Sequence, residues 1–279
     1  MSFKTILVYC DSSEATKGRL AVAIELSQRF GSHLIALHVR PAFESAAFFD
    51  SGLSMDTLYT AYREGMEREA AAAKAIFDAA TERKDLPAEW RSVEGFVDDE
   101  VVVHARYADL VVAGQAGPPE RANVSTPSDL SETVAMASGR MVLVVPYIPV
   151  AEAPGKIVML CWNASRESAR AATDALPFLK GAEKVIVLVV DPGKSRGHGA
   201  EPGADVAGWL VRHGVKAFVQ RDTAVDGDVG ATILSRAADH GVDLIVMGIY
   251  GHSRVREFVL GGASRTLLAS MTVPVLMAH

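Results

Sequence analysis

The sequence predicts an α/β protein built from two tandem, doubly wound parallel sheets of five strands each. Three observations predict this fold class. The chain repeats its own pattern, apolar strands alternate with helical segments in both halves, and a length of 279 residues suits two domains of ordinary size. Fully apolar strands that alternate with helices are typical of a parallel sheet covered on both faces and connected by right-handed crossovers.

The first part of each copy has the same strand–helix–strand pattern. TILVYCD at residues 5–11 matches KIVMLCWN at residues 156–163, and each run ends in a polar residue before a small-residue turn. The segments that follow also correspond: helices Glu14–Phe30 and Arg166–Leu179, the glycines Gly31 and Gly181 that should end them, and second strands His33–Arg40 and Lys184–Asp191. Agreement in order, spacing and residue type indicates an internal repeat.

The later part of each copy repeats as well. ADLVVAG at residues 108–114 matches VDLIVMG at residues 242–248, and each run reaches another glycine three residues on. A helix and a last short strand then complete each copy. The last strands are Met141–Pro146 and Val273–Met277.

Two domains follow from this repeat, residues 1–148 and residues 155–279. The junction YIPVAEAPG at residues 147–155 has two prolines and no apolar period, which is typical of a short linker. The copies differ in their middle parts. The first has a long helical pattern at Met55–Arg83, whereas the second has a shorter one at Gly203–His213.

Composition excludes several classes of protein. A net charge of -6 argues against a nucleic-acid-binding surface, which is normally strongly basic. No apolar run approaches the roughly 20 residues of a membrane span, and the first residues lack a signal-peptide pattern. The two cysteines form no CxxC motif or Cys/His cluster, which favours a reducing compartment. We therefore expect a soluble cytoplasmic protein that binds neither nucleic acid nor membrane.

A candidate anion-binding loop joins the fourth strand of the second copy to its last helix. Its skeleton is one glycine, two residues, a second glycine, nine residues, and a glycine pair that opens the helix. Glycines let the backbone approach an anion, and a helix N-terminus offers unpaired N–H groups. The predicted nucleotide-binding residues here are Met247, Gly248, Gly251, His252, Arg254, Gly261, Gly262, Ala263 and Ser264. The alternative is a glycine-punctuated connection without a ligand.

The first copy lacks such a loop. After GQAG at residues 114–117 the chain runs PPERANVSTPSDLSETV, with three prolines and no glycine before the helix. Prolines stiffen the loop and remove amide donors. Ser128 is the expected N-cap, and Asp129 and Glu132 occupy the positive end of the helix. The sequence therefore predicts that the first copy has no phosphate site.

Polar residues at the ends of the two first strands form the other wall of the expected crevice. Asp11 in copy one and Asn163 in copy two hold matching positions. In a doubly wound sheet such residues can reach a base or ribose, and Val190 could flank an adenine. Capping of the next helix, by these residues or by Ser12 and Ser165, is the alternative.

Taken together, these residues resemble the universal stress protein family over essentially the whole chain. ATP-binding members of that family carry G-x2-G-x9-G followed by Ser or Thr. Gly248, Gly251 and Gly261 match this motif, and Gly262 stands where the hydroxyl residue is expected. The resemblance implies an adenine nucleotide alpha hydrolase-like, Rossmann-like fold.

The resemblance also implies roles for individual residues and surfaces. The adenine-contacting Asp of the family corresponds to Asn163 in copy two and Asp11 in copy one. Family domains pair through the last strand, so Met141–Val145 should meet Val273–Met277 in an intramolecular pseudo-dimer. Further pairing into a homodimer is compatible with this arrangement.

We expect a stress-response protein that binds ATP in its C-terminal domain as a regulatory ligand, with AMP or ADP as alternatives and Mg²⁺ as the companion ion. No catalytic residue is assigned, because no Walker-type lysine follows the glycines and no carboxylate is evident beside the loop. Hydrolysis would be slow at most. One alternative is a nucleotide-independent interaction module with vestigial sites. Another is a weak nucleotide hydrolase with His252 as base and Ser264 as nucleophile.

Overall fold

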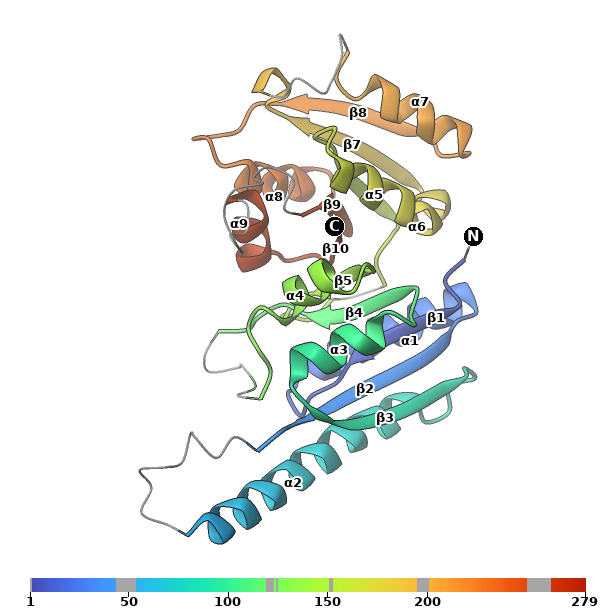
Figure 1. The fold of residues 1–279 in the computed structure, drawn as a ribbon. Coiled ribbons are helices and arrows are strands. Elements are labelled where there is room, and N and C mark those ends of the chain that lie inside the picture. Colours follow the sequence, from blue (N-terminus) through green and yellow to red (C-terminus); the bar gives the residue numbers. More distant parts are fainter. Residues whose placement is uncertain are drawn as a thin grey trace.

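The computed structural model describes residues 2–43, 54–118, 123, 125–150, 153–194, 201–249 and 262–279. Ten strands in these ranges form one continuous sheet in the order β3-β2-β1-β4-β5-β10-β9-β6-β7-β8 (Figure 1). The first five are β1 Thr5–Tyr9, β2 His33–Pro41, β3 Ala88–Gly95, β4 Leu110–Gly114 and β5 Met141–Val145. The others are β6 Ile157–Cys161, β7 Lys184–Val190, β8 Ala217–Asp222, β9 Leu244–Gly248 and β10 Val275–Ala278. The predicted α/β class is confirmed.

Each half contains five strands with the same topology. All pairings within a half are parallel, and the strand order reverses between β1 and β4 in one half and between β6 and β9 in the other. Such a reversal separates the two crossover connections that start there, which opens a crevice beyond the carboxyl ends of the strands. The chain therefore carries two equivalent crevices.

The two five-stranded sheets are not separate layers but join edge to edge. β5 pairs antiparallel with β10, with Leu143 opposite Leu276. All residues of both strands are buried. This confirms the intramolecular pairing expected between the last strands, although β10 begins at Val275 and ends at Ala278. An antiparallel junction follows because the two halves are related by an approximate two-fold rotation.

Helices cover both faces of the sheet and form a three-layer structure (Figure 1). One face carries α1 Ala15–Phe30, α2 Met55–Thr81, α5 Arg166–Asp174, α6 Leu176–Gly181 and α7 Ala204–Arg212. The other carries α3 Val97–Ala105, α4 Leu130–Ala137, α8 Val229–Asp239 and α9 Gly262–Ser270. Alternate strand residues point to opposite faces, so Ile6 and Val8 join one apolar core and Leu7 and Tyr9 join the other. Both cores continue across the junction between the halves.

Side chains near the junction hold the halves together. The rings of Phe3 and Phe30 lie 5.5 and 5.4 Å from the ring of Phe178 in α6. The Arg29 guanidinium donates to the Pro154 carbonyl at 3.1 Å. On the other side of the sheet, the Gln115 amide donates to the Leu268 carbonyl at 2.7 Å. The pairing is therefore a packed interface with specific polar contacts.

Two predicted helix boundaries are wrong. The single helix expected at Arg166–Leu179 is divided into α5 and α6, because Pro177 in the first turn of α6 has no N–H and its ring crowds the carbonyl of the preceding turn. The second piece, α6, ends at Gly181, as expected. In the first copy, α4 begins at Leu130 with Asp129 as its N-cap, without a side-chain hydrogen bond. Ser128 is therefore not the cap.

A repeated aspartate ties the amino ends of neighbouring strands together in both halves. Asp109 before β4 accepts hydrogen bonds from the backbone N–H groups of Lys4 and Thr5 at 2.7 and 3.0 Å. Asp243 before β9 accepts from the N–H groups of residues 155–157. Asp243 thus lies at the end of β9 remote from the crevice. Among the described residues, no helix is long and apolar enough to cross a membrane.

Candidate functional site

The C-terminal crevice contains those predicted site residues that the structure describes. Gly248 is the last residue of β9, Val190 is the last residue of β7, and Asn163 follows β6 by two residues. These three lie at the same edge of the sheet. Met247 is buried, and Gly262, Ala263 and Ser264 form the first turn of α9. Gly251, His252, Arg254 and Gly261 lie outside the described residues.

Gly248 has a packing role that the sequence does not reveal. A Cβ atom at this position would lie 2.4 Å from the backbone carbon of Glu167 and 2.5 Å from the backbone nitrogen of Ser168. Backbone atoms of a helix cannot move aside, so only glycine allows β9 to approach the first turn of α5 this closely. Helix packing alone therefore explains a glycine at this position.

Asn163 and Ser165 organise the turn between β6 and α5. The Asn163 Oδ1 atom accepts a hydrogen bond from the Ser165 N–H at 3.1 Å, and Ser165 Oγ accepts from the Ser168 N–H at 3.2 Å. Ser165 is therefore the N-cap of α5. Asn163 uses one acceptor in this turn, while its Nδ2 group has no partner among the described residues. Asn163 therefore keeps an amide donor that the turn does not use.

Glu167 is a carboxylate in this crevice that sequence reasoning missed. Its side chain is 4% exposed. A Cβ atom added at Gly248 would lie 2.7 Å from the Cβ atom of Glu167. Burial raises the pKa of Glu167, but hydrogen bonds from Arg166, its own backbone and Ser165 outweigh burial and lower the pKa overall. Glu167 thus lies against Gly248, the residue from which the loop departs. Only packing of α5 against β9 brings Glu167 there, and no sequence pattern signals it.

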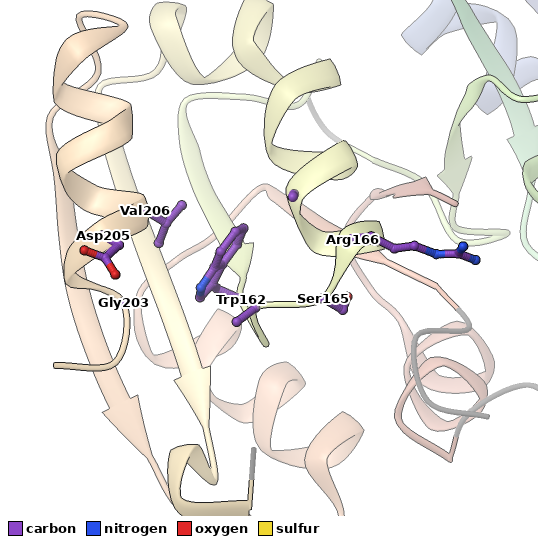
Figure 2. Close-up of a pocket in the computed structure, with 8 residues that line it drawn as sticks. Trp162, Ser165, Arg166, Gly203, Asp205 and Val206 are labelled. Carbon is purple, nitrogen blue, oxygen red and sulfur yellow. The ribbon is translucent and has the colours of Figure 1, made fainter. Parts of the chain in front are cut away.

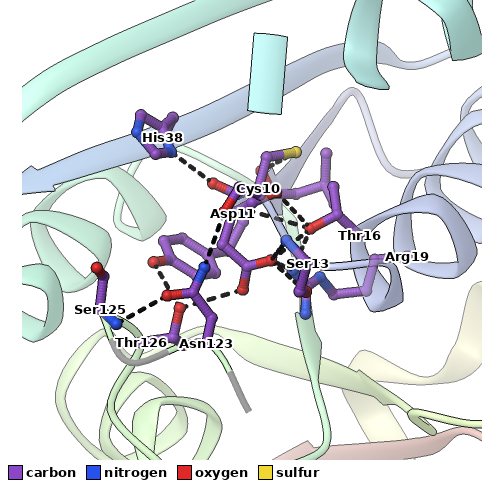
Figure 3. Close-up of polar contacts among 12 residues, drawn as sticks. Cys10, Asp11, Ser13, Thr16, Arg19, His38, Asn123, Ser125 and Thr126 are labelled. Carbon is purple, nitrogen blue, oxygen red and sulfur yellow. Dashed lines mark hydrogen bonds and ion pairs between the residues drawn. The ribbon is translucent and has the colours of Figure 1, made fainter. Parts of the chain in front are cut away.

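The matching crevice of copy one is filled by its own side chains (Figure 3). Asp11 is 3% exposed and pairs with the Arg19 guanidinium at 2.9 Å. The Asp11 carboxylate also accepts hydrogen bonds from Thr16 Oγ1 at 2.7 Å, from Thr126 Oγ1 at 3.1 Å and from the Ser13 hydroxyl. Burial raises the pKa of Asp11, but Arg19 and these hydroxyls outweigh it and lower the pKa to about 2. Asp11 is thus an ionised, fully engaged structural group.

Arg19 occupies the space next to β4 in this crevice. A Cβ atom at Gly114 would lie 2.5 Å from Arg19 Nη1. The guanidinium also lies over the Tyr9 ring at 5.9 Å, and the Tyr9 hydroxyl lies 3.1 Å from Thr126 Oγ1. Gly114 matches Gly248, but in copy one a flexible side chain packs there, whereas in copy two helix backbone does.

Glu69 of α2 bonds to residues that surround this network. Its carboxylate accepts hydrogen bonds from Ser12 Oγ at 3.3 Å, Asn123 Nδ2 at 2.7 Å and Ser125 Oγ at 3.0 Å. These contacts fasten α2 to the segment between β4 and α4. The long helix of copy one thus helps to fill the crevice with protein side chains.

A cavity of about 370 Å³ lies in the second copy between the first turns of α5 and α7 (Figure 2). Six of its lining residues are Trp162, Ser165, Arg166, Gly203, Asp205 and Val206. None of the predicted nucleotide-binding residues lines it. Within the described ranges, no group of three His, Cys, Asp or Glu side chains could hold a metal ion. The cavity is therefore distinct from the crevice between β6 and β9.

The fold and its two crevices define an α/β protein made of two doubly wound domains in tandem. Comparison with known sequences then gives the family: the sequence model of the universal stress protein family matches residues 2–146 and 155–279. The chain belongs to this family and contains two of its domains in tandem. The family resemblance drawn from the sequence is confirmed.

Solved structures show the same fold over nearly the whole chain. A universal stress protein from Archaeoglobus fulgidus DSM 4304 has a TM-score of 0.74 at 18% identity, covering 98% of this chain and 95% of that chain. A functionally unknown protein, PA1789 from Pseudomonas aeruginosa PAO1, has a TM-score of 0.58 at 12% identity, covering 99% and 92%. These identities are low, so the two structures support the fold alone.

Among curated proteins, Universal stress protein Slr1230 from Synechocystis sp. (strain ATCC 27184 / PCC 6803 / Kazusa) is 36% identical over 50 residues. The match covers 18% of this chain and 17% of that protein. It agrees with the family but spans too little of either protein to describe the activity of the whole.

Proposed function

We propose that this universal stress protein binds an adenine nucleotide in its C-terminal domain as a regulatory ligand, with ATP as the first candidate and AMP or ADP as alternatives. One observation carries the proposal. The G-x2-G-x9-G-G sequence leaves the sheet at Gly248, beside β6, and returns at Gly262 in the first turn of α9. A glycine-rich segment between the end of a strand at a switch point and a helix N-terminus suits phosphate binding.

The remaining described groups of the crevice fit a nucleotide. Asn163 retains an amide donor, Val190 is half-buried at the end of β7, and the first turn of α9 has no acidic residue. Copy one differs because its Asp11 carboxylate is already bonded to protein side chains and its Arg19 fills the space beside β4. One nucleotide site per chain is therefore the proposed stoichiometry.

Charge at the crevice favours a nucleotide bound together with Mg²⁺. The ionised carboxylate of Glu167 would repel a bare polyphosphate. Mg²⁺ is commonly held by one or two carboxylates together with substrate phosphates and water, and Glu167 is a suitable protein ligand. When bound, the ion supplies positive charge between the two anions. Arg166, beside Glu167 in the first turn of α5, would add a mobile guanidinium.

We assign a regulatory role and not a catalytic one. Ser264, the serine considered as a nucleophile, is 5% exposed in the first turn of α9. A buried hydroxyl is poorly placed to attack a phosphate, and no lysine follows the glycines of the loop after β9. We also assign the protein to the cytoplasm, with no nucleic acid or membrane partner. Any homodimer would need a surface other than β5 and β10, which bury each other.

The test is titration with labelled ATP in the presence of Mg²⁺. The wild-type chain should bind saturably with one site, and the double variant Gly251→Asp, Gly261→Asp should not bind. The matched control is Gly117→Asp in the corresponding loop of copy one, which should bind like wild type. Absence of saturable binding by the wild type, or equal binding by the double variant, would refute the proposal and leave a nucleotide-independent interaction module.

A further inference from the structure

The cavity over Trp162 is separate from the proposed nucleotide site and has a physical origin in the shorter helix of copy two. α7 begins at Ala204, after Gly203 with a φ of 87°. In copy one the helix on this face, α2, begins at Met55 and runs for 27 residues. Glu69 of α2 bonds to Ser12 in the corresponding region. Among the described residues of copy two, no side chain covers the space in this way.

The residues around this space differ between the copies in one consistent direction. At three matching positions of the strand–helix connection, copy one has Cys10, Ser12 and Lys17. Copy two has Trp162, Ala164 and Ala169 at those positions, and all three line the cavity. Two polar side chains are thus replaced by alanine, and a small buried thiol is replaced by an indole. These changes remove two polar side chains and add an aromatic face, while Ser165, Arg166 and Asp205 keep the wall mixed in polarity.

The indole of Trp162 stands in the cavity beside Val206, as Figure 2 shows. The Arg166 side chain points away from the space (Figure 2). Asp205 lies at the rim in the first turn of α7, is exposed, and has no partner among the described residues. The cavity therefore offers an aromatic face, a wall that mixes apolar and polar groups, and one hydrogen-bond acceptor of negative charge.

We propose that this cavity binds a small planar aromatic ring that carries an N–H donor, stacked on the Trp162 indole with its donor toward Asp205. A volume of about 370 Å³ lies within the range of small-molecule sites. Stacking on an aromatic side chain suits any flat ring, and the carboxylate selects against anionic rings. A free aromatic compound and a nucleobase share this chemistry, and the experiment distinguishes them.

The experiment uses the full chain labelled with 5-fluorotryptophan, which gives one fluorine resonance for each of the three tryptophans. Trp162→Phe assigns the resonance of the cavity. Indole and adenine serve as separate probes at up to millimolar concentration. The Trp162 resonance should shift saturably with at least one probe, whereas the resonances of Trp90 and Trp209 should not. A response to indole alone indicates a free aromatic compound, and a response to adenine indicates a nucleobase.

Variants that fill the cavity complete the test. Ala169→Leu should weaken probe binding by at least tenfold, which is within the contribution of ring stacking. The matched control, Lys17→Leu at the same position of copy one, should bind like wild type. If thermal unfolding shows that Ala169→Leu does not fold, Asp205→Phe fills the space from the opposite wall. The Gly251→Asp, Gly261→Asp double variant should retain probe binding, so failure of the nucleotide site would not affect this result.

Three outcomes would overturn the inference. The first is no saturable shift of the Trp162 resonance with either probe. The second is an equal shift of the Trp209 resonance, since Trp209 does not line the cavity and its ring lies 4.3 Å from the ring of His213, at a tilt of 51°. The third is unchanged probe binding in the cavity-filling variant.

Discussion

The two crevices of this molecule have the same fold and opposite contents. In copy one, Asp11 and Arg19 form a buried ion pair that fills the crevice between β1 and β4. At the matching positions copy two has Asn163 and Ala171, which carry no charge. Copy two therefore lacks both the acid and the base of this pair. One crevice is therefore filled by a buried ion pair, and the matching crevice has no such pair.

The largest expected effect comes from removing one partner of the Asp11–Arg19 ion pair. Arg19→Ala leaves the Asp11 carboxylate buried without its cation, which should lower the free energy of unfolding by about 3–5 kcal/mol. Chemical denaturation at neutral pH measures this loss.

The double variant Asp11→Asn, Arg19→Ala reproduces copy two and serves as the control. It should recover much of the stability, because replacing both members of a buried pair is far less damaging than removing one. A single variant that loses less than about 1 kcal/mol would show that the pair is not an essential element of copy one.

The matching glycines at the ends of β4 and β9 allow a second test of the difference between the copies. Gly248→Ala should destabilise the protein by about 3 kcal/mol, toward the upper end for overpacking, because its Cβ atom would meet the backbone of α5. Gly114→Ala should cost less, because its Cβ atom would meet only the end of the flexible Arg19 side chain. Thermal unfolding of both variants checks the order, and equal losses would contradict it.

The pH dependence of stability follows from the lowered pKa of Asp11. Its pKa is about 2 in the folded state, against about 3.9 in an unfolded chain. The folded state therefore gains stability above about pH 4, and this gain is lost as the pH falls from about 4 to about 2. The expected loss is about 2 kcal/mol.

Denaturant midpoints across this pH range measure the loss. The Asp11→Asn, Arg19→Ala variant should lack this component and show a correspondingly flatter profile. If its profile below pH 4 equals that of the wild type, the acid sensitivity arises elsewhere.

The sequence predicts the inner strands well because they are continuous apolar runs, as at Thr5–Tyr9 and Leu244–Gly248. Such a run has no solvent-facing alternative in a parallel sheet. The edge strands β3 and β8 are partly polar and lack this pattern. The break between α5 and α6 has a signal in the sequence, Pro177 inside the expected helix, but the prediction of one helix did not use it. The joining of the two sheets through β5 and β10 came from the family resemblance and not from residue patterns.

The contents of the crevices depend on contacts between distant segments, which a linear pattern does not encode. Asp11 and Thr126 are 115 residues apart, and their hydrogen bond depends on the path of the chain after β4. The packing of Gly248 on α5 and the cavity over Trp162 arise in the same way. The predicted roles of Gly251, His252, Arg254 and Gly261 remain predictions, because these residues lie outside the described ranges.

The last difference between the copies concerns Glu167, which matches Ala15 in copy one. If ATP binds beside Gly248, an ionised carboxylate there makes its affinity depend on Mg²⁺. Binding to the wild type should weaken by about tenfold, or about 1.4 kcal/mol, when EDTA removes the ion. In Glu167→Gln the affinities with and without Mg²⁺ should become similar, since the neutral amide neither repels phosphate nor holds the ion strongly.

Titration with labelled ATP in both conditions measures this ratio, and Glu14→Gln in copy one is the matched control that should keep it. Thermal unfolding should confirm that Glu167→Gln folds, because the substitution also removes the pairing with Arg166. A wild-type affinity that is indifferent to EDTA, or a Glu167→Gln variant that keeps the full Mg²⁺ effect, would remove Glu167 from the ion's environment. Either result would leave nucleotide binding itself intact, because the two measurements share a site but depend on different groups.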